Sequence, residues 1–179
     1  MKSTTLSLIC HAPTEAQRVG RFPGADETPR DVAQVRLSLP VADHVLVAPE
    51  LRARQTAEAL GLRGQVDDEL RDCDFGRWQG MLLKHLEAQE PEALQQWLGD
   101  PCAAPHDGES IEHVCQRVAR WVEGMARGGS WQVVTHPMVV RAALIHVLGC
   151  PLDTFHRIDV PPLSVVQLSH YGRWRFKAG

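Results

Sequence analysis

Short apolar segments alternate along the chain with longer segments in which apolar residues recur every three or four positions. Short apolar runs bounded by polar or turn residues are typical of buried strands. Four such runs occur, at residues 5–10, 44–47, 131–135 and 164–168. We therefore predict four strands, spread over nearly the whole chain.

Amphipathic helices are predicted between these strands, where apolar residues follow a helical period. The helical segments are residues 30–39, 50–60, 91–97, 111–127 and 137–148. The segment 111–127 has the clearest apolar stripe, with Ser110 as a candidate N-cap and two glycines after its end. Pro137 suits the first turn of the last helix, and Gly149 lies just past its end.

Two stretches lack a strong periodic pattern. Residues 11–29 are polar and contain glycine and proline, which predicts a long loop. Residues 73–105 have weak sheet signals, and we expect a helical lobe that caps the site. Strands alternating with helices indicate an α/β fold, a three-layer sandwich with a mostly parallel central sheet flanked by helices. We expect a single domain over residues 1–179.

Composition narrows the functional classes. The chain has 179 residues, 44% of them hydrophobic, and a formal net charge of -3, which argues against a nucleic-acid-binding protein. No apolar run reaches the ~20 residues of a membrane-spanning helix, and the first residues lack a signal-peptide pattern. We therefore expect a cytoplasmic protein with no membrane partner. Five scattered cysteines without a C-x-x-C pair indicate neither a disulfide framework nor a zinc site.

Three polar side chains follow predicted strands, where open α/β sheets bind their ligands. His11 follows the first strand, His136 follows the third, and Arg52 lies in the first turn of the helix after the second. Each residue taken singly is more typical of a satisfied polar group or a surface charge. Together, at the edge where helix N-termini also favour anions, they suit a phosphate.

Five segments in the same order carry a resemblance to a known family. They are Cys10-His11-Ala12-Pro13-Thr14, Ala48-Pro49-Glu50-Leu51-Arg52-Ala53-Arg54-Gln55-Thr56-Ala57, Leu70 to Gly80, Pro105 to Ser110, and Val134 to Ala142. Over nearly its whole length the chain resembles the histidine phosphatase superfamily, the phosphoglycerate-mutase-like proteins. The family's Arg-His-Gly motif reads Cys-His-Ala here.

The resemblance implies a double displacement through phosphohistidine. It makes His11 the nucleophile, places Arg52 and His136 on the phosphoryl oxygens, and puts the general acid and base at Asp72, one methylene shorter than the usual Glu. The first loop adds further candidate phosphate-binding residues, namely Thr14, Gln17 and Arg21. No metal and no organic cofactor is implied, and the expected partner is a small phosphorylated metabolite or another anion.

Two departures from the family pattern fall within the motifs. Cys10 stands where the family has a phosphate-binding arginine, and Pro137, which has no backbone N–H, stands where the family has a glycine. Losing one such donor costs roughly 3–4 kcal/mol of transition-state stabilisation. An arginine from elsewhere could compensate, with Arg18, Arg21 and Arg141 as candidates. Cys10 itself is not predicted to be a nucleophile, because Cys-x₅-Arg would need an arginine at residue 16.

Three functions therefore remain open. The first is a phosphatase for a small phosphate monoester, of low activity if the departures are not compensated. The second is a catalytically silent anion-binding or interaction module that retains the fold. A phosphoglycerate mutase is disfavoured because its extra segments need a longer chain. The sequence does not choose the substrate, and a homodimer stays open.

Four further side chains are assigned simpler roles. We expect Trp78 and Trp97 to pack the lobe onto the sheet, and His106 and His113 to lie at the surface.

Overall fold

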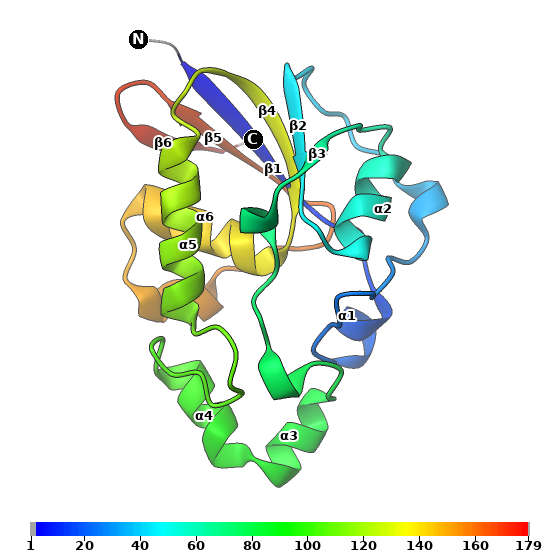
Figure 1. Ribbon diagram of the computed structural model, residues 1–179, viewed down its shortest axis with the longest axis vertical. Helices are drawn as coiled ribbons and strands as arrows, with labels where there is room; N and C mark the ends of the chain where they lie inside the picture. The colour runs from blue at the N-terminus through cyan, green and yellow to red at the C-terminus, as the bar shows by residue number, and fades with distance from the viewer. Residues whose placement is uncertain (1–2, 179) are drawn as a thin grey trace.

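A six-stranded sheet runs through the described part of the chain, residues 3–178 of the computed structural model (Figure 1). Its strands are β1 Thr4–Cys10, β2 His44–Val47, β3 Gln65–Val66, β4 Gly129–Thr135, β5 Val165–His170 and β6 Trp174–Lys177. Their order is β3-β2-β4-β1-β5-β6, in which the first four pair in parallel and the last two join antiparallel. The sheet is therefore mostly parallel, as predicted.

Helices cover both faces of this sheet. They are α1 Glu15–Val19, α2 Leu51–Ala59, α3 Leu83–Gln89, α4 Pro91–Gly99, α5 Ile111–Gly124 and α6 Pro137–Leu148. Because crossovers between parallel strands are right-handed, α2 lies on one face and the packed pair α5 and α6 on the other (Figure 1). The predicted α/β three-layer fold is confirmed.

The two longest helices form where the sequence predicted them. Ser110 caps α5 by accepting a hydrogen bond from the His113 N–H at 3.1 Å, and the apolar stripe of α5 is buried. This helix ends at Gly124, three residues earlier than predicted. Pro137 occupies the first turn of α6, and Gly149 ends that helix with φ 65°.

The prediction of a helix over residues 30–39 is wrong. The structure has only a 3₁₀ turn at Val32–Gln34, and Asp31 before it adopts φ 54°, a left-handed conformation that an α-helix cannot include. Only Val35 of the periodic apolar positions becomes fully buried. Since no continuous apolar face is covered there, the periodicity has no packing energy to stabilise it.

The predicted loop over residues 11–29 contains α1, a helix of five residues. A capping box forms it, in which Thr14 and Gln17 each accept the other's backbone N–H. Strands β3 and β6 were also not predicted from the sequence. Both residues of β3 are exposed, so its sequence has no apolar alternation to detect.

The lobe of α3 and α4 lies at the lower end of the molecule in Figure 1, beyond the carboxyl ends of β1 and β4. Trp78 and Trp97 are buried and pack edge-to-face against each other. The surface location predicted for His106 is wrong, because its ring is fully buried against both indoles, with ring centroids 4.9 and 4.5 Å away. Its Nδ1 accepts the Gly108 N–H, which satisfies one polar atom in that apolar setting. His113 is exposed, as expected.

The strand register brings the two predicted histidines to the same level. Cys10, the last residue of β1, pairs with Thr135, the last residue of β4, so His11 and His136 follow directly at neighbouring strand ends. The His11 N–H also donates to the Thr135 carbonyl at 3.0 Å. In the described residues no helix is both long and apolar enough to cross a membrane.

Candidate active site

His11 is buried, and its tautomer is set by a backbone contact. Its Nδ1 lies 2.8 Å from the Ala12 carbonyl oxygen, which can only accept, so Nδ1 bears the hydrogen and Nε2 has a free lone pair. Burial, reinforced by the charge of His136, lowers the pKa of His11 from 6.5 to about 4. The ring is therefore neutral at physiological pH, as a nitrogen nucleophile requires.

His136 lies against His11, with the ring centroids 5.3 Å apart. It is the N-cap residue of α6, so the positive end of that helix dipole lies beside it. Its Nε2 is 2.6 Å from the Glu50 Oε2 atom, and its Nδ1 is 3.6 Å from the Asp72 Oδ2 atom. Each ring nitrogen therefore faces a carboxylate.

Arg52 and Asp72 form a buried ion pair beside the two rings. The Arg52 Nη2 atom donates to Asp72 Oδ2 at 2.6 Å, and Nη1 donates to the Gly24 carbonyl at 2.8 Å. Burial by itself would raise the pKa of Asp72, but the charges of His136 and Arg52 outweigh it and hold that pKa below its ordinary value. Asp72 is thus ionised in the free protein.

The structure brings together four predicted site residues, which we call the four-residue cluster: His11, Arg52, Asp72 and His136. Among the described residues, Arg52 Nε and His136 Nδ1 are buried and make no hydrogen bond. Two unused nitrogen positions in one buried cluster are unusual, since buried polar groups are normally satisfied. Arg52 Nε is a donor, and His136 Nδ1 is a donor when both ring nitrogens carry hydrogen. They suit an anion with several acceptor oxygens.

Two residues that support this cluster had no predicted role. Glu50 bridges it, because Oε2 contacts His136 and Oε1 accepts the Asp72 N–H at 2.9 Å. The Thr56 hydroxyl accepts the Ala12 N–H at 2.9 Å and so fixes the residue whose carbonyl orients His11. Both residues lie in the second motif segment, but only the tertiary contacts identify their partners.

The three candidates from the first loop are engaged elsewhere. Thr14 and Gln17 form the capping box of α1, and Arg21 pairs with Glu27 at 2.8 Å. Within residues 3–178, no hydrogen bond or ion pair joins these three side chains to the four-residue cluster. Their predicted contact with phosphate stays a proposal.

The position of Cys10 is apolar in character. The thiol is fully buried, and burial, reinforced by the Asp72 charge, raises the pKa of Cys10 to about 12. It is therefore a neutral thiol at physiological pH and a weak donor.

Of the candidate replacement arginines, Arg18 pairs with Glu15 in solvent, whereas Arg141 is half-buried and its charge partly opposes the rise in the Cys10 pKa. Arg141 therefore acts electrostatically on Cys10, although its Nε already donates to the Ile158 carbonyl.

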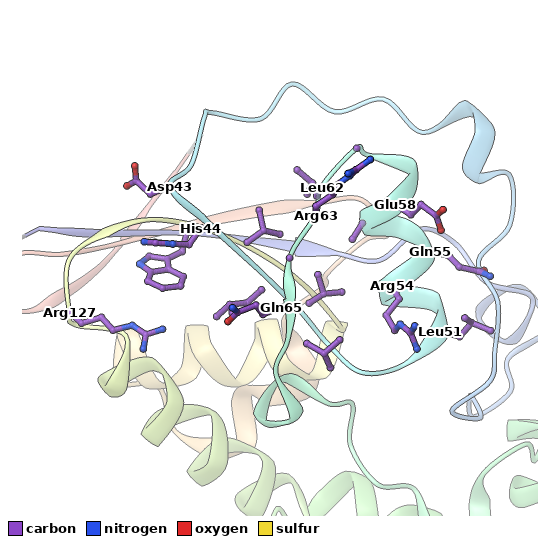
Figure 2. Close-up of a pocket in the computed structure, with 18 residues that line it drawn as sticks. Asp43, His44, Leu51, Arg54, Gln55, Glu58, Leu62, Arg63, Gln65 and Arg127 are labelled. Carbon is purple, nitrogen blue, oxygen red and sulfur yellow. The ribbon is translucent and has the colours of Figure 1, made fainter.

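A cavity of about 1290 Å³ lies away from the cluster, between β2, β3 and the outward side of α2 (Figure 2). Arg54 and Glu58 of α2 line it, whereas Arg52 and Thr56 of the same helix face the cluster. None of the cluster residues lines this cavity. Its size alone does not make it the reaction site.

The low pKa of His11 predicts a loss of stability in acid. Below pH 6.5 the unfolded chain binds a proton at this residue, but the folded protein does not until about pH 4, so stability falls over this window and then levels off. The shift corresponds to about 3 kcal/mol. We expect the His11→Gln variant to lose about that much less stability than the wild type between pH 6.5 and 4, measured by urea unfolding. Parallel pH profiles would contradict the shifted pKa.

Comparison with known proteins places this geometry in a family. The chain is 30% identical to phosphoserine phosphatase 1 of Hydrogenobacter thermophilus over 172 residues, which is 84% of this chain and 79% of the relative. A solved mycobacterial glucosyl-3-phosphoglycerate phosphatase in complex with VO3 superposes with a TM-score of 0.80 at 26% identity, covering 97% of this chain and 96% of the other.

A longer relative and a family model complete the comparison. The chain is 28% identical over 182 residues to a bifunctional protein of Mycobacterium tuberculosis, a match that covers 92% of this chain and 50% of the relative, so the chain spans about half the length of that protein. The model of the histidine phosphatase superfamily (branch 1) matches residues 6–178. The chain therefore belongs to the histidine phosphatase superfamily.

Proposed function

We propose that the protein hydrolyses a small phosphate monoester through a phosphohistidine formed on Nε2 of His11. The observation that carries this proposal is the neutral His11, whose Nε2 has a free lone pair and whose ring lies against His136, beside the buried Arg52–Asp72 ion pair. Relatives named as phosphoserine and glucosyl-3-phosphoglycerate phosphatases support the same reaction class.

Substrate binding first exchanges one anion for another. In the free protein the Asp72 carboxylate occupies the Arg52 guanidinium, so a phosphoryl group has to compete for that cation. A phosphate dianion that shares Arg52 and His136 weakens their hold on the Asp72 charge and adds a second negative charge beside it. Both effects raise the pKa of Asp72 and favour its protonation, which prepares it to act as an acid.

In the first chemical step His11 attacks phosphorus. The Nε2 lone pair forms the N–P bond, the bond from phosphorus to the ester oxygen breaks, and the leaving alkoxide takes the proton of the Asp72 carboxyl. The Ala12 carbonyl stabilises the positive charge that forms on the ring, because it accepts the Nδ1 hydrogen. Arg52 and His136 stabilise the charge on the phosphoryl oxygens.

The second step reverses these roles. Asp72, now a carboxylate, takes a proton from a water molecule as its oxygen attacks phosphorus, the N–P bond breaks, and its electron pair returns to Nε2 of His11. Inorganic phosphate leaves, and the free protein is restored once Asp72 releases its proton. No step requires a residue outside the four-residue cluster.

Turnover of p-nitrophenyl phosphate tests the proposal, combined with an alkaline quench that preserves phosphohistidine. We expect catalytic release of phosphate and a phosphoryl adduct on the peptide that contains His11, detected by mass spectrometry. Neither release nor adduct, together with measurable binding of inorganic phosphate, would favour the silent anion-binding module. Cys10 and Pro137 keep that alternative open, because both replace phosphate donors of the family pattern.

A further inference from the structure

Glu50 directs its carboxylate away from the helix that it begins. It is the N-cap residue of α2, a position from which carboxylates normally accept N–H groups of their own helix, but its side chain makes no such bond. Its side chain is only 12% exposed, and its two oxygens contact His136 Nε2 at 2.6 Å and the Asp72 N–H at 2.9 Å. The Glu50 carboxylate therefore binds two members of the four-residue cluster.

The contact with Glu50 fixes which nitrogen of His136 is free. Burial would raise the pKa of Glu50, but the hydrogen bond and the charge of His136 outweigh it and hold that pKa below its ordinary value. An ionised carboxylate only accepts, so His136 Nε2 must carry a hydrogen. The ring then presents Nδ1 on the side of His11 and Asp72, where it has no hydrogen-bond partner among the described residues.

The charged groups around the ring favour a proton on Nδ1 as well. Glu50 and Asp72 each place a carboxylate oxygen near one ring nitrogen, and the neighbouring His11 is neutral. Arg52 and the positive N-terminal end of α6 oppose a charge on the ring, but Arg52 is paired with Asp72. Two carboxylates at opposite nitrogens stabilise an imidazolium, which can donate from both positions.

We propose that Glu50 is a positioning residue that holds His136 as an imidazolium with Nδ1–H directed at the transferring phosphoryl group. This role rests on the proposed function. It supplies a fixed cationic donor in a site that has a thiol at Cys10 and no N–H at Pro137. Glu50 does not touch the substrate in this role and acts only through the ring.

The variant Glu50→Gln tests this role, because glutamine keeps the shape and removes the charge. We expect kcat/KM for p-nitrophenyl phosphate to fall by about 10- to 100-fold at neutral pH, as for other residues that orient a functional histidine. We also expect the pH dependence of kcat/KM to change, because the variant removes the negative charge that lies beside His136. The matched control is Glu58→Gln on the same helix, an exposed residue that lines the separate cavity and should leave both quantities unchanged.

A spectroscopic measurement separates this role from the enzymatic proposal. In protein labelled with nitrogen-15 histidine, long-range hydrogen–nitrogen correlations report whether each ring nitrogen carries hydrogen, and His136→Asn assigns the signal. We expect wild-type His136 to be an imidazolium at neutral pH and Glu50→Gln to convert it to a neutral ring. This result would support the role of Glu50 even if the protein has no phosphatase activity. A neutral His136 ring in the wild-type protein would by itself overturn the proposed role. An active wild type with an unshifted profile in Glu50→Gln would also overturn it and leave the proposed function intact.

Discussion

The His11→Gln variant is expected to lose turnover of phosphate monoesters by at least about 10⁴-fold, the range seen when a covalent nucleophile is removed. Glutamine can still donate a hydrogen bond, but its amide nitrogen has no basic lone pair to attack phosphorus. The neutral ring of His11 has one, at an Nε2 that the Nδ1 contact with Ala12 leaves free. Steady-state release of phosphate, with kcat and KM fitted separately, measures the loss.

Binding should survive this change, because Arg52 and His136 remain. We expect His11→Gln to bind inorganic phosphate within about tenfold of the wild type, by isothermal calorimetry, because it loses no charged partner of the anion. His113→Gln is the matched control, since that imidazole is exposed. Turnover in His11→Gln close to the wild-type rate would show that water attacks phosphorus directly and would exclude the covalent route.

The strand-end residues of the site could be predicted from the sequence alone. His11 and His136 follow two strongly apolar strands, and parallel strands bring such positions to one edge of the sheet. Asp72 came only from the motif resemblance, because it follows a short 3₁₀ turn that has no periodic pattern. Glu50 lies within the second motif segment, but its contact with His136 spans 86 residues, and no local sequence pattern encodes such a pair.

The fold was predictable where packing and pattern agree. Helix α5 has a continuous apolar stripe that becomes buried, so its period, cap and existence were all inferred correctly. Residues 30–39 have a similar period, but the chain there stays in loops with most of its apolar positions only partly covered. Helix α1 shows the opposite case, since a local capping box stabilises five residues that have no stripe. Local hydrogen bonds thus stabilise α1, which the apolar period did not predict. The lack of long-range burial explains why the helix predicted over residues 30–39 does not form.

The segment that carries Asp72 depends on one buried arginine of α5. Arg117 is 3% exposed, and its guanidinium binds both carboxylate oxygens of Glu109 at 2.8 Å. The same group donates to the Glu69 and Arg71 carbonyls at 2.7 and 3.1 Å. These contacts satisfy backbone acceptors in an irregular stretch that has few bonds of its own, so Arg117 fixes the path of the chain into Asp72.

Replacing Arg117 by methionine is therefore expected to destabilise the protein by about 2–3 kcal/mol, because it removes the buried partner of Glu109 and the donor to the Glu69 and Arg71 carbonyls. Urea unfolding followed by tryptophan fluorescence measures this loss, with Arg120→Met as the control, since Arg120 lies exposed one turn further along α5. The double variant Arg117→Met with Glu109→Leu should recover part of the loss, because it also removes the carboxylate that has lost its buried partner but does not restore a donor to the carbonyls. A loss in Arg117→Met no larger than in Arg120→Met would mean that the segment before Asp72 is fixed by other contacts, such as the hydrogen bond from Thr135 Oγ1 to the Leu70 carbonyl at 2.9 Å.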